Sequence, residues 1–221
     1  MIDYPVMLQL KGRRCVIVGV GPVGRRKLQS LLPTGADIVL IAPDADIQRL
    51  PAQITTICRS FVASDLDGAA LVFAATGSSQ TNREIAAAAK KRGVWANIAD
   101  DPQESDFTLP ALLRRDALTI AVGTAGKSPA AAALIRDSIE RSLGPGWGLF
   151  LQIAARLRSL RLTSDSDPLY NRQILLLLLE RGLIRLLESG DRAGIELLFE
   201  FAFKGQVTLA DFDIDLPKGA S

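Results

Sequence analysis

The sequence predicts an α/β protein, in which a parallel sheet with helices on its faces is followed by an all-helical region. Short apolar stretches alternate with helical patterns between residues 14 and 98, and this alternation is typical of parallel strands joined by right-handed crossovers. The first apolar stretch runs directly into a glycine-rich turn. A helical pattern that begins at Trp147 predicts the second part.

The glycine-rich turn follows a predicted strand at residues 14–18 and contains Gly19, Gly21 and Gly24. In this G-x-G-x-x-G spacing the first glycine permits a tight turn, the second permits close approach of a pyrophosphate, and the third permits close packing of helix and strand. The residues after Gly24 have a helical pattern, and the amides at a helix start favour phosphate. The turn therefore predicts a Rossmann-type dinucleotide site, but it says nothing about a substrate.

The other predicted elements of the first part place four loops at the carboxyl ends of strands. Strands are predicted at 38–41, 54–58, 71–75 and 95–98, with helices at 25–32 and 80–92. Ligands of parallel sheets gather outside the carboxyl ends of the strands, so one crevice is expected to collect the loops that follow. These loops are residues 19–24, 42–44, 76–77 and 97–101.

The pattern changes after about residue 112. A strand is predicted at 118–122 and a helix at 130–143, with Ser128 as its N-cap and Pro129 in its first turn. Residues 211–221 lack periodicity and are predicted to form a loose tail. The glycines expected to interrupt the helical region are Gly182, Gly190, Gly194 and Gly205.

Composition excludes several classes of function. The net charge of +2 predicts no general affinity for nucleic acid or membranes. The longest apolar run, 174–179, is too short to span a bilayer, and the start lacks the basic region of a secretory signal, which favours a cytoplasmic location.

The chain has no histidine and two cysteines, which restricts its chemistry. Ser-His-Asp and Cys-His catalysis are excluded, and a structural zinc site lacks ligands. Cys15 and Cys58 fall in predicted strands and are expected to be buried thiols rather than a disulfide. Acid–base chemistry must therefore use carboxylates, Lys, Tyr or water.

Asp100 is the preferred candidate for that chemistry. It follows the predicted strand at 95–98, and a carboxylate near a dinucleotide can accept a proton from a substrate that loses hydride. Asp101 precedes Pro102, which favours extended backbone, so Asp100 is the better placed to point into the crevice. A solvated loop would also explain these adjacent acids, and Glu104 and Asp106 are expected to be surface charges.

The acidic residue that usually binds the ribose of a dinucleotide, roughly 20 residues beyond the glycine turn, is not found at its usual position in this sequence. The strand at 38–41 is followed by Ala42, Pro43 and Asp44, so Asp44 lies late and competes with Asp37 and Asp46. A solvated loop explains Asp44 equally well. The lack of an arginine at this strand end favours NAD over NADP.

The loop at 123–129 is a second segment suited to anions. It combines Gly126, the hydroxyls of Thr124 and Ser128, and the charge of Lys127 at a helix N-terminus. An ordinary capped helix start explains Ser128 fully. The additional glycine, threonine and lysine favour contact with a substrate.

At this point the residues resemble the precorrin-2 dehydrogenase / sirohydrochlorin ferrochelatase family, which includes the amino-terminal half of bacterial siroheme synthase and its stand-alone relatives. The motifs that are specific to this family are Asn-x-x-Asp-x-Pro at 97–102 and, further along the chain, Gly-x-Ser-Pro at 126–129. The matching residues are Tyr4, Pro5, Val6, Leu10, 15–24, Arg26, Lys27, 74–76, 97–102, Phe107, Pro110, Gly126, Ser128 and Pro129.

The resemblance implies an organisation and an activity. The organisation is a Rossmann NAD-binding domain at 1–112, a dimerisation region at 113–145 and a helical domain at 146–221, in a homodimer. The activity is NAD-dependent oxidation of precorrin-2, a tetrapyrrole with many carboxylates, to sirohydrochlorin in siroheme biosynthesis. Some members also insert Fe²⁺ as ferrochelatases, and the sequence does not decide whether this chain does.

The residues and the resemblance together assign roles to the site. Asp100 is expected to be catalytic, and Thr124 keeps the hydroxyl of a serine that is common in fused bacterial enzymes. The expected cofactor-binding residues are Gly19, Gly21, Pro22, Val23, Gly24, Pro43, Asp44 and Thr76. The expected substrate-binding residues are Asn97, Thr124, Gly126, Lys127 and Ser128.

Two other functions stay open. An NAD(H)-sensing module without catalysis would need only the glycine turn and would be indifferent to Asp100. A dehydrogenase for another substrate would keep the turn and the aspartate.

Overall fold

The computed structural model describes residues 3–43, 50–159 and 168–217, which fall into two compact units, Met1–Leu109 and Pro110–Ser221. Each unit has its own hydrophobic core.

The first unit contains a five-stranded sheet whose strands are all parallel, in the order β3-β2-β1-β4-β5. Strand β4 is buried at all four residues, as expected for a parallel sheet covered on both faces. This order reverses direction between β1 and β4, and the predicted Rossmann-type sheet is confirmed. The strands are β1 (Arg14–Val18), β2 (Asp37–Ile41), β3 (Thr55–Ile57), β4 (Leu71–Ala74) and β5 (Trp95–Ile98).

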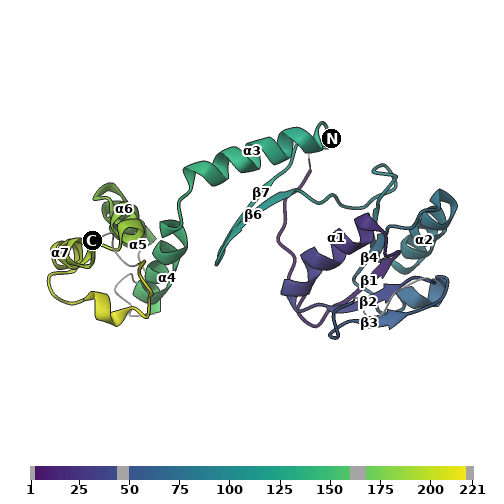
Figure 1. Cartoon of the computed structure of the whole chain (residues 1–221), viewed down its shortest axis with the longest axis horizontal. Helices are drawn as coiled ribbons and strands as arrows, with labels where there is room; N and C mark the ends of the chain where they lie inside the picture. Colours follow the sequence, from purple (N-terminus) through teal and green to yellow (C-terminus); the bar gives the residue numbers. More distant parts are fainter. Residues whose placement is uncertain (1–2, 44–49, 160–167, 218–221) are drawn as a thin grey trace. The chain divides into compact units, whose positions relative to one another are not determined.

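Helices α1 (Pro22–Leu31) and α2 (Ser79–Arg92) lie on opposite faces of this sheet (Figure 1). Side chains alternate between the two faces along each strand, so β1 sends Ile17 to the core beside α1 and Val16 to the core beside α2. Short 3-10 helices, η1 (Leu32–Thr34) and η3 (Ala63–Leu66), complete the connections. With both faces covered, the carboxyl edge of the sheet is where loops can present side chains to a ligand.

The second unit begins with an antiparallel hairpin, β6 (Ala111–Arg115) and β7 (Leu118–Val122), against which α3 (Pro129–Ser142) packs. Strand β6 was not predicted from the sequence, because its residues Ala-Leu-Leu-Arg-Arg show no alternation and become a strand only by pairing with β7. Asp116 takes a positive φ of 49° at the turn between them. The helical core follows, with α4 (Gly146–Ser159), α5 (Pro168–Glu180), α6 (Leu183–Ser189), α7 (Arg192–Phe203) and the 3-10 helix η4 (Leu209–Asp211).

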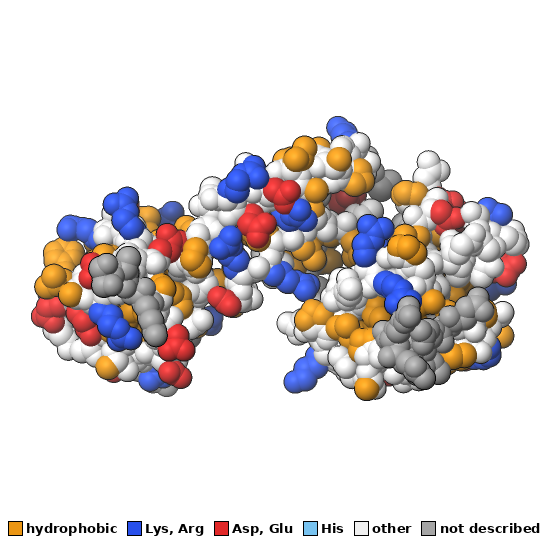
Figure 2. Space-filling view, in the orientation of Figure 1, with side chains coloured by type: hydrophobic (Ala, Val, Ile, Leu, Met, Phe, Trp, Pro, Cys, Tyr) orange, Lys and Arg blue, Asp and Glu red, His pale blue; other side chains and the backbone are white. Residues whose placement is uncertain are grey.

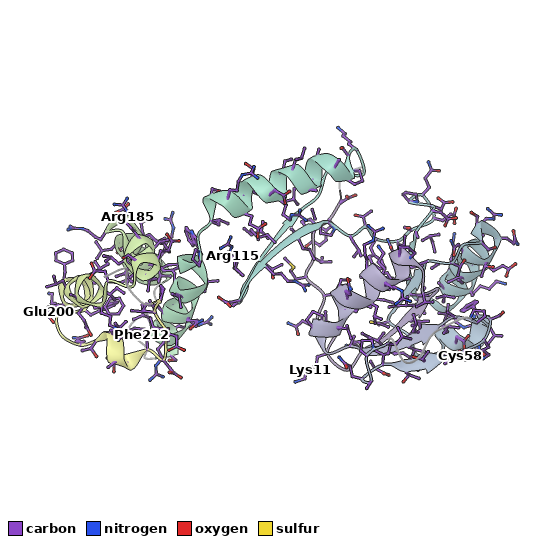
Figure 3. The ribbon with its side chains drawn as sticks, viewed as in Figure 1. Lys11, Cys58, Arg115, Arg185, Glu200 and Phe212 are labelled. Atoms are coloured by element: carbon purple, nitrogen blue, oxygen red, sulfur yellow. The ribbon has the colours of Figure 1, made fainter. Side chains whose placement is uncertain are left out.

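The prediction of a loose tail at 211–221 was wrong for the described residues, 211–217. Phe212 is buried, and its ring lies 5.3 Å from that of Phe199 in the helical core (Figure 3). The order of this segment could not be predicted from periodicity, because a single buried aromatic residue can anchor a segment that has no periodic pattern. Residues 218–221 lie outside the described residues.

Two smaller predictions were also wrong. Gly194 lies inside α7, where the cap residue Asp191 accepts a hydrogen bond from its amide, so it does not interrupt the helix. Cys58 follows the end of β3 and is exposed (Figure 3), whereas Cys15 is buried as expected. The division of the second unit into a dimerisation region and a helical domain stays a prediction.

In the described parts of the chain, the search for membrane spans found no helix with the length and apolar character to cross a bilayer.

Candidate active site

The glycine turn is pressed against the end of β4. Gly19 has a φ of +102°, and a Cβ atom there would lie 2.3 Å from the carbonyl oxygen of Ala75. A Cβ atom on Gly24 would lie 2.1 Å from the carbonyl oxygen of Gly19. Any side chain at these two positions would collide with backbone, so both glycines are required by packing.

Gly21 differs from its neighbours because space is open around it. A Cβ atom there would have no atom within 4 Å, and Gly21 caps α1 without a side-chain hydrogen bond. Pro22 has no N–H, so the amides of Val23 and Gly24 are the donors at this helix start that lack an intrahelical acceptor. An open approach to amides that precede the first intrahelical hydrogen bond, together with a helix dipole, fits the pyrophosphate of a dinucleotide.

Thr76 lies two residues beyond β4, next to the glycine turn's contact with Ala75. Its backbone N–H and its hydroxyl donate to Oδ1 of Asn82, at 3.2 Å and 2.7 Å. Asn82 lies on the first turn of α2 and is 1% exposed. The predicted cofactor residue Thr76 is thus held from behind by a buried amide.

Asp100 lies two residues beyond β5 and is also held by α2. Its Oδ2 accepts from the hydroxyl of Ser79 at 2.5 Å, and its Oδ1 accepts from Nδ2 of Asn82 at 2.7 Å. These two hydrogen bonds, that from Ser79 first, lower the pKa of Asp100 below its ordinary value. The carboxylate is exposed and charged at neutral pH, so it is available as a proton acceptor.

A small pocket of about 90 Å³ surrounds this carboxylate. Asp101 also lines the pocket, but its Oδ1 accepts from the amides of Gln103 and Glu104, at 3.1 Å and 3.3 Å, and so shapes the loop. This arrangement supports the choice of Asp100 over Asp101. The pocket is lined by Ser79, Asn82, Arg83, Ala86, Ile98, Asp100, Asp101 and Glu104.

Other predicted residues of the first unit have different surroundings. Asn97 is 9% exposed, and its Nδ2 donates to the carbonyl of Phe107 at 2.9 Å, so its role toward a substrate stays a prediction. Pro43 follows β2, while Asp44 and Asp46 lie outside the described residues. Asp106 is not merely a surface charge, because its carboxylate accepts from the amide of Ala96 at 2.8 Å and covers the edge of β5.

The loop at 123–128 belongs to the second unit and bonds mainly to itself. The hydroxyl of Thr124 donates to the carbonyl of Ser128 at 3.1 Å, and Ser128 Oγ accepts from the amide of Ala131 at 3.1 Å. Gly126 has a φ of +74°, and Lys127 is exposed. The predicted N-cap is confirmed, while contact of this loop with a substrate stays a prediction.

Sequence reasoning missed Ser79 and Asn82. Both lie at the start of a helix that was predicted from residue 80, where polar residues are ordinary surface or capping residues. The feature that distinguishes Asn82 from a surface residue is its burial. This burial results from the packing of α2 on the sheet and cannot be read from the sequence.

Comparison with known proteins shows which proteins this chain is similar to. Residues 6–111 match the family model "Putative NAD(P)-binding", and residues 115–142 match the model "Sirohaem biosynthesis protein central". Siroheme synthase of Nitrosomonas europaea is 36% identical over 163 residues, which cover 71% of this chain and 34% of that protein. Siroheme synthase 2 of Pectobacterium atrosepticum is 31% identical over 220 residues, which cover 94% of this chain and 48% of that protein.

The chain is similar to part of the siroheme synthases. It spans about a third to a half of the length of the relatives it matches. The solved structure of SirC, a precorrin-2 dehydrogenase, superposes with a TM-score of 0.71 over 90% of this chain and all of that chain, at 24% identity, and this likeness supports the fold. The predicted resemblance to this family and the dinucleotide-binding character of the first unit are confirmed.

Proposed function

We propose that this chain catalyses the NAD-dependent dehydrogenation of precorrin-2 to sirohydrochlorin in siroheme biosynthesis, with Asp100 as the proton acceptor. The observation that carries the proposal is an exposed carboxylate, held by two hydrogen bonds, at the same carboxyl edge of the sheet as the open glycine turn. The siroheme synthases and the precorrin-2 dehydrogenase to which the chain is similar indicate the substrate.

The glycine turn is the part of the chain that fits NAD. The amides of Val23 and Gly24 would hold its pyrophosphate beside Gly21, where no side chain intrudes. Thr76 follows the neighbouring strand and would lie on the side toward Asp100. NAD supplies the acceptor for the hydride that leaves the substrate.

Asp100 performs the chain's own chemical step. Loss of a hydride leaves a cationic substrate that must release a proton, and the ionised carboxylate accepts it. Ser79 and Asn82 fix the direction of the carboxylate before the substrate arrives, which saves the cost of ordering it during the reaction. Because these bonds lower the pKa of Asp100, the acquired proton passes readily to solvent at this exposed position.

The carboxylates of precorrin-2 require cationic and hydrogen-bonding partners. Lys127, with Thr124, Gly126 and Ser128, is proposed to supply some of them. Asn97 is proposed to contribute from the first unit.

The decisive experiment is incubation of the purified chain with precorrin-2 and NAD⁺ under anaerobic conditions, followed by the absorbance of NADH and of sirohydrochlorin. Asp100→Ala is expected to lower kcat by about 10³-fold or more while NAD affinity, measured by calorimetry, stays unchanged. Asp67→Ala, which removes an exposed carboxylate paired with Arg92, is the matched control.

Full activity of Asp100→Ala would overturn its role. Binding of NAD without conversion of precorrin-2 by the unaltered chain would favour the sensing module or another substrate.

A homodimer is part of this proposal. Helix α3 packs on the hairpin, yet Leu134 and Ile135 on it are 69% and 47% exposed, and hydrophobic side chains gather on this helix in Figure 2. A second copy of the chain would cover them. Light scattering after size-exclusion chromatography measures the state directly.

Fe²⁺ is the proposed substrate of a second, ferrochelatase activity. The tetrapyrrole nitrogens would supply the ligands of the inserted metal. The described residues contain no cluster of three or more His, Cys, Asp or Glu side chains that could hold a metal. Sirohydrochlorin with Fe²⁺ or Co²⁺, followed by its absorbance, tests this activity. A cytoplasmic location likewise stays a prediction.

A further inference from the structure

One buried amide joins the two predicted halves of the site. Asn82 accepts from the backbone N–H and the hydroxyl of Thr76 through Oδ1, and donates to Asp100 through Nδ2. Thr76 follows β4 and Asp100 follows β5, so these two loops and α2 meet at one side chain (α2 and β4 are labelled in Figure 1).

Only an amide can make this set of contacts. The position is 1% exposed, and a buried polar group is costly unless it is hydrogen-bonded. Oδ1 faces two donors, and Nδ2 faces the Asp100 carboxylate and, at 3.4 Å, the carbonyl of Thr76, so the site needs an acceptor and a donor on one planar group. A carboxylate would repel Asp100, and an aliphatic side chain would leave the Thr76 amide without this acceptor.

Ser79, the other donor to Asp100, is placed differently. It is exposed, and its hydroxyl bonds the carboxylate from the solvent side of the helix start. Water can replace such a donor. Water cannot easily replace Asn82, because this side chain is buried and is fixed at its other end by Thr76.

We infer that Asn82 is a positioning residue: it fixes the Asp100 carboxylate relative to the Thr76 turn, and so relative to the cofactor edge of the sheet. This inference rests on the proposed function. Asn82 itself acts through Asp100 and through Thr76.

The charges that face Asp100 come from two segments. Arg83 on α2 lines the pocket and favours the ionised form, while Asp101 and Glu104 line it from the loop after β5. The hydrogen bond from Asn82 adds to that from Ser79 in lowering the pKa of Asp100. Loss of the Asn82 donor should therefore raise this pKa.

Asn82→Asp is the sharpest variant. It keeps an oxygen to accept from Thr76 and replaces the group that donates to Asp100 at 2.7 Å and, more weakly, to the carbonyl of Thr76 at 3.4 Å. Two carboxylates at hydrogen-bond distance share a proton, so the acidic limb of the kcat–pH profile should move up by about one pH unit or more. Because Asp100 also loses its fixed direction, kcat should fall about 10-fold to 100-fold even at a pH well above this limb, while KM for NAD changes by less than about 3-fold.

Gln80→Glu is the matched control. It makes the same amide-to-carboxylate change on the exposed surface of α2, where Gln80 bonds Glu84 and Arg83. Its pH profile should move much less than that of Asn82→Asp. An equal displacement in both variants would mean that the added charge, rather than the hydrogen bond, causes the effect, and would overturn the inference.

Asn82→Ser covers the case in which Asn82→Asp fails to fold. The serine side chain is too short to reach both Thr76 and Asp100, so kcat should fall. This variant adds no second carboxylate, so an added charge cannot cause the fall. A Ser variant that is folded by thermal unfolding and has the kcat of the unaltered chain would overturn the inference.

A titration that needs no turnover separates this inference from the proposed function. The carboxyl ¹³C resonance of Asp100, identified by its loss in Asp100→Asn, reports its pKa in the unaltered chain and in Asn82→Ser. A rise of this pKa in Asn82→Ser supports the positioning role even if precorrin-2 proves not to be the substrate. An unchanged pKa overturns it even if the chain oxidises precorrin-2.

Discussion

In the first unit, Asp65, Asn82 and Asn97 are polar side chains that are nevertheless buried, whereas the buried side chains described in the second unit are apolar. The core of the second unit gathers aromatic and aliphatic residues around Phe199. Its polar side chains, such as Ser128 and Asp191, cap helices only a few residues away.

The difference shows which unit has its geometry fixed by buried polar hydrogen bonds. Asn82 joins segments that follow β4 and β5, and Asn97 joins β5 to the chain near Phe107. Buried polar groups of this kind are stabilising only when every partner is in place, so they specify one arrangement. A purely apolar core tolerates more repacking. The unit that is rigidly specified is the one that presents Asp100.

The largest expected effect comes from the glycine turn. Gly24→Ala places a Cβ atom 2.1 Å from a backbone oxygen, so the turn must shift, with an expected loss of about 2–4 kcal/mol in stability and of NAD binding. Gly21→Ala meets no atom and should fold normally, but its methyl group should weaken NAD binding about 10-fold. Thermal unfolding and calorimetry measure both. Equal stability losses in the two variants would contradict this view of the turn.

The second prediction concerns the buried carboxylate of Asp65. Arg59 donates to both of its oxygens, at 2.8 Å and 2.6 Å, and the amide of Val62 adds a third bond. These contacts, that of Arg59 first, hold the pKa of Asp65 below its ordinary value. Its stabilising contribution is thus complete above the unfolded pKa of about 3.9 and is lost as the pH falls through the lower folded pKa.

Asp65→Asn should therefore lower the unfolding temperature at pH 7, and the gap to the unaltered chain should narrow below about pH 4. Unfolding followed by circular dichroism between pH 3 and pH 7 provides the measurement. A gap that is independent of pH would show that the charge of Asp65 contributes nothing. Asp67→Asn, at an exposed pair, is the control.

The smallest effect is expected in the second unit, where contacts are local. Ser128→Ala removes one N-cap hydrogen bond and should cost about 1 kcal/mol of stability. If the loop also binds precorrin-2 as proposed, KM for precorrin-2 should rise while KM for NAD stays constant. A loss of stability with both KM values unchanged would mean that Ser128 only caps the helix and does not contribute to binding of precorrin-2.

Sequence alone predicted much of the first unit, because its signals are local. The apolar runs gave β1 and β5 with their observed bounds, and Gly93 marked the end of α2. The stop of α1 and the cap at Ser128 were likewise legible from residue types. Signals of this sort need no partner elsewhere in the chain.

Prediction failed where a residue's role depends on a distant partner. β6 exists only as the pair of β7, Phe212 is anchored by α7, and Asn82 is buried only because α2 packs on the sheet. Asp106 is exposed, as predicted for a surface charge, but its bond to the amide of Ala96, ten residues away on an edge strand, was not predicted.

The sequence by itself determined the dinucleotide turn and favoured Asp100 over Asp101 as the proposed catalytic residue, since glycine spacing, the following proline and the absence of histidine are all written in the chain. The tertiary structure decided what holds Asp100. Two parallel strands end side by side and a helix lies behind them, so one amide can bond to both loops at once. That convergence depends on strand order and helix packing, which no local pattern encodes.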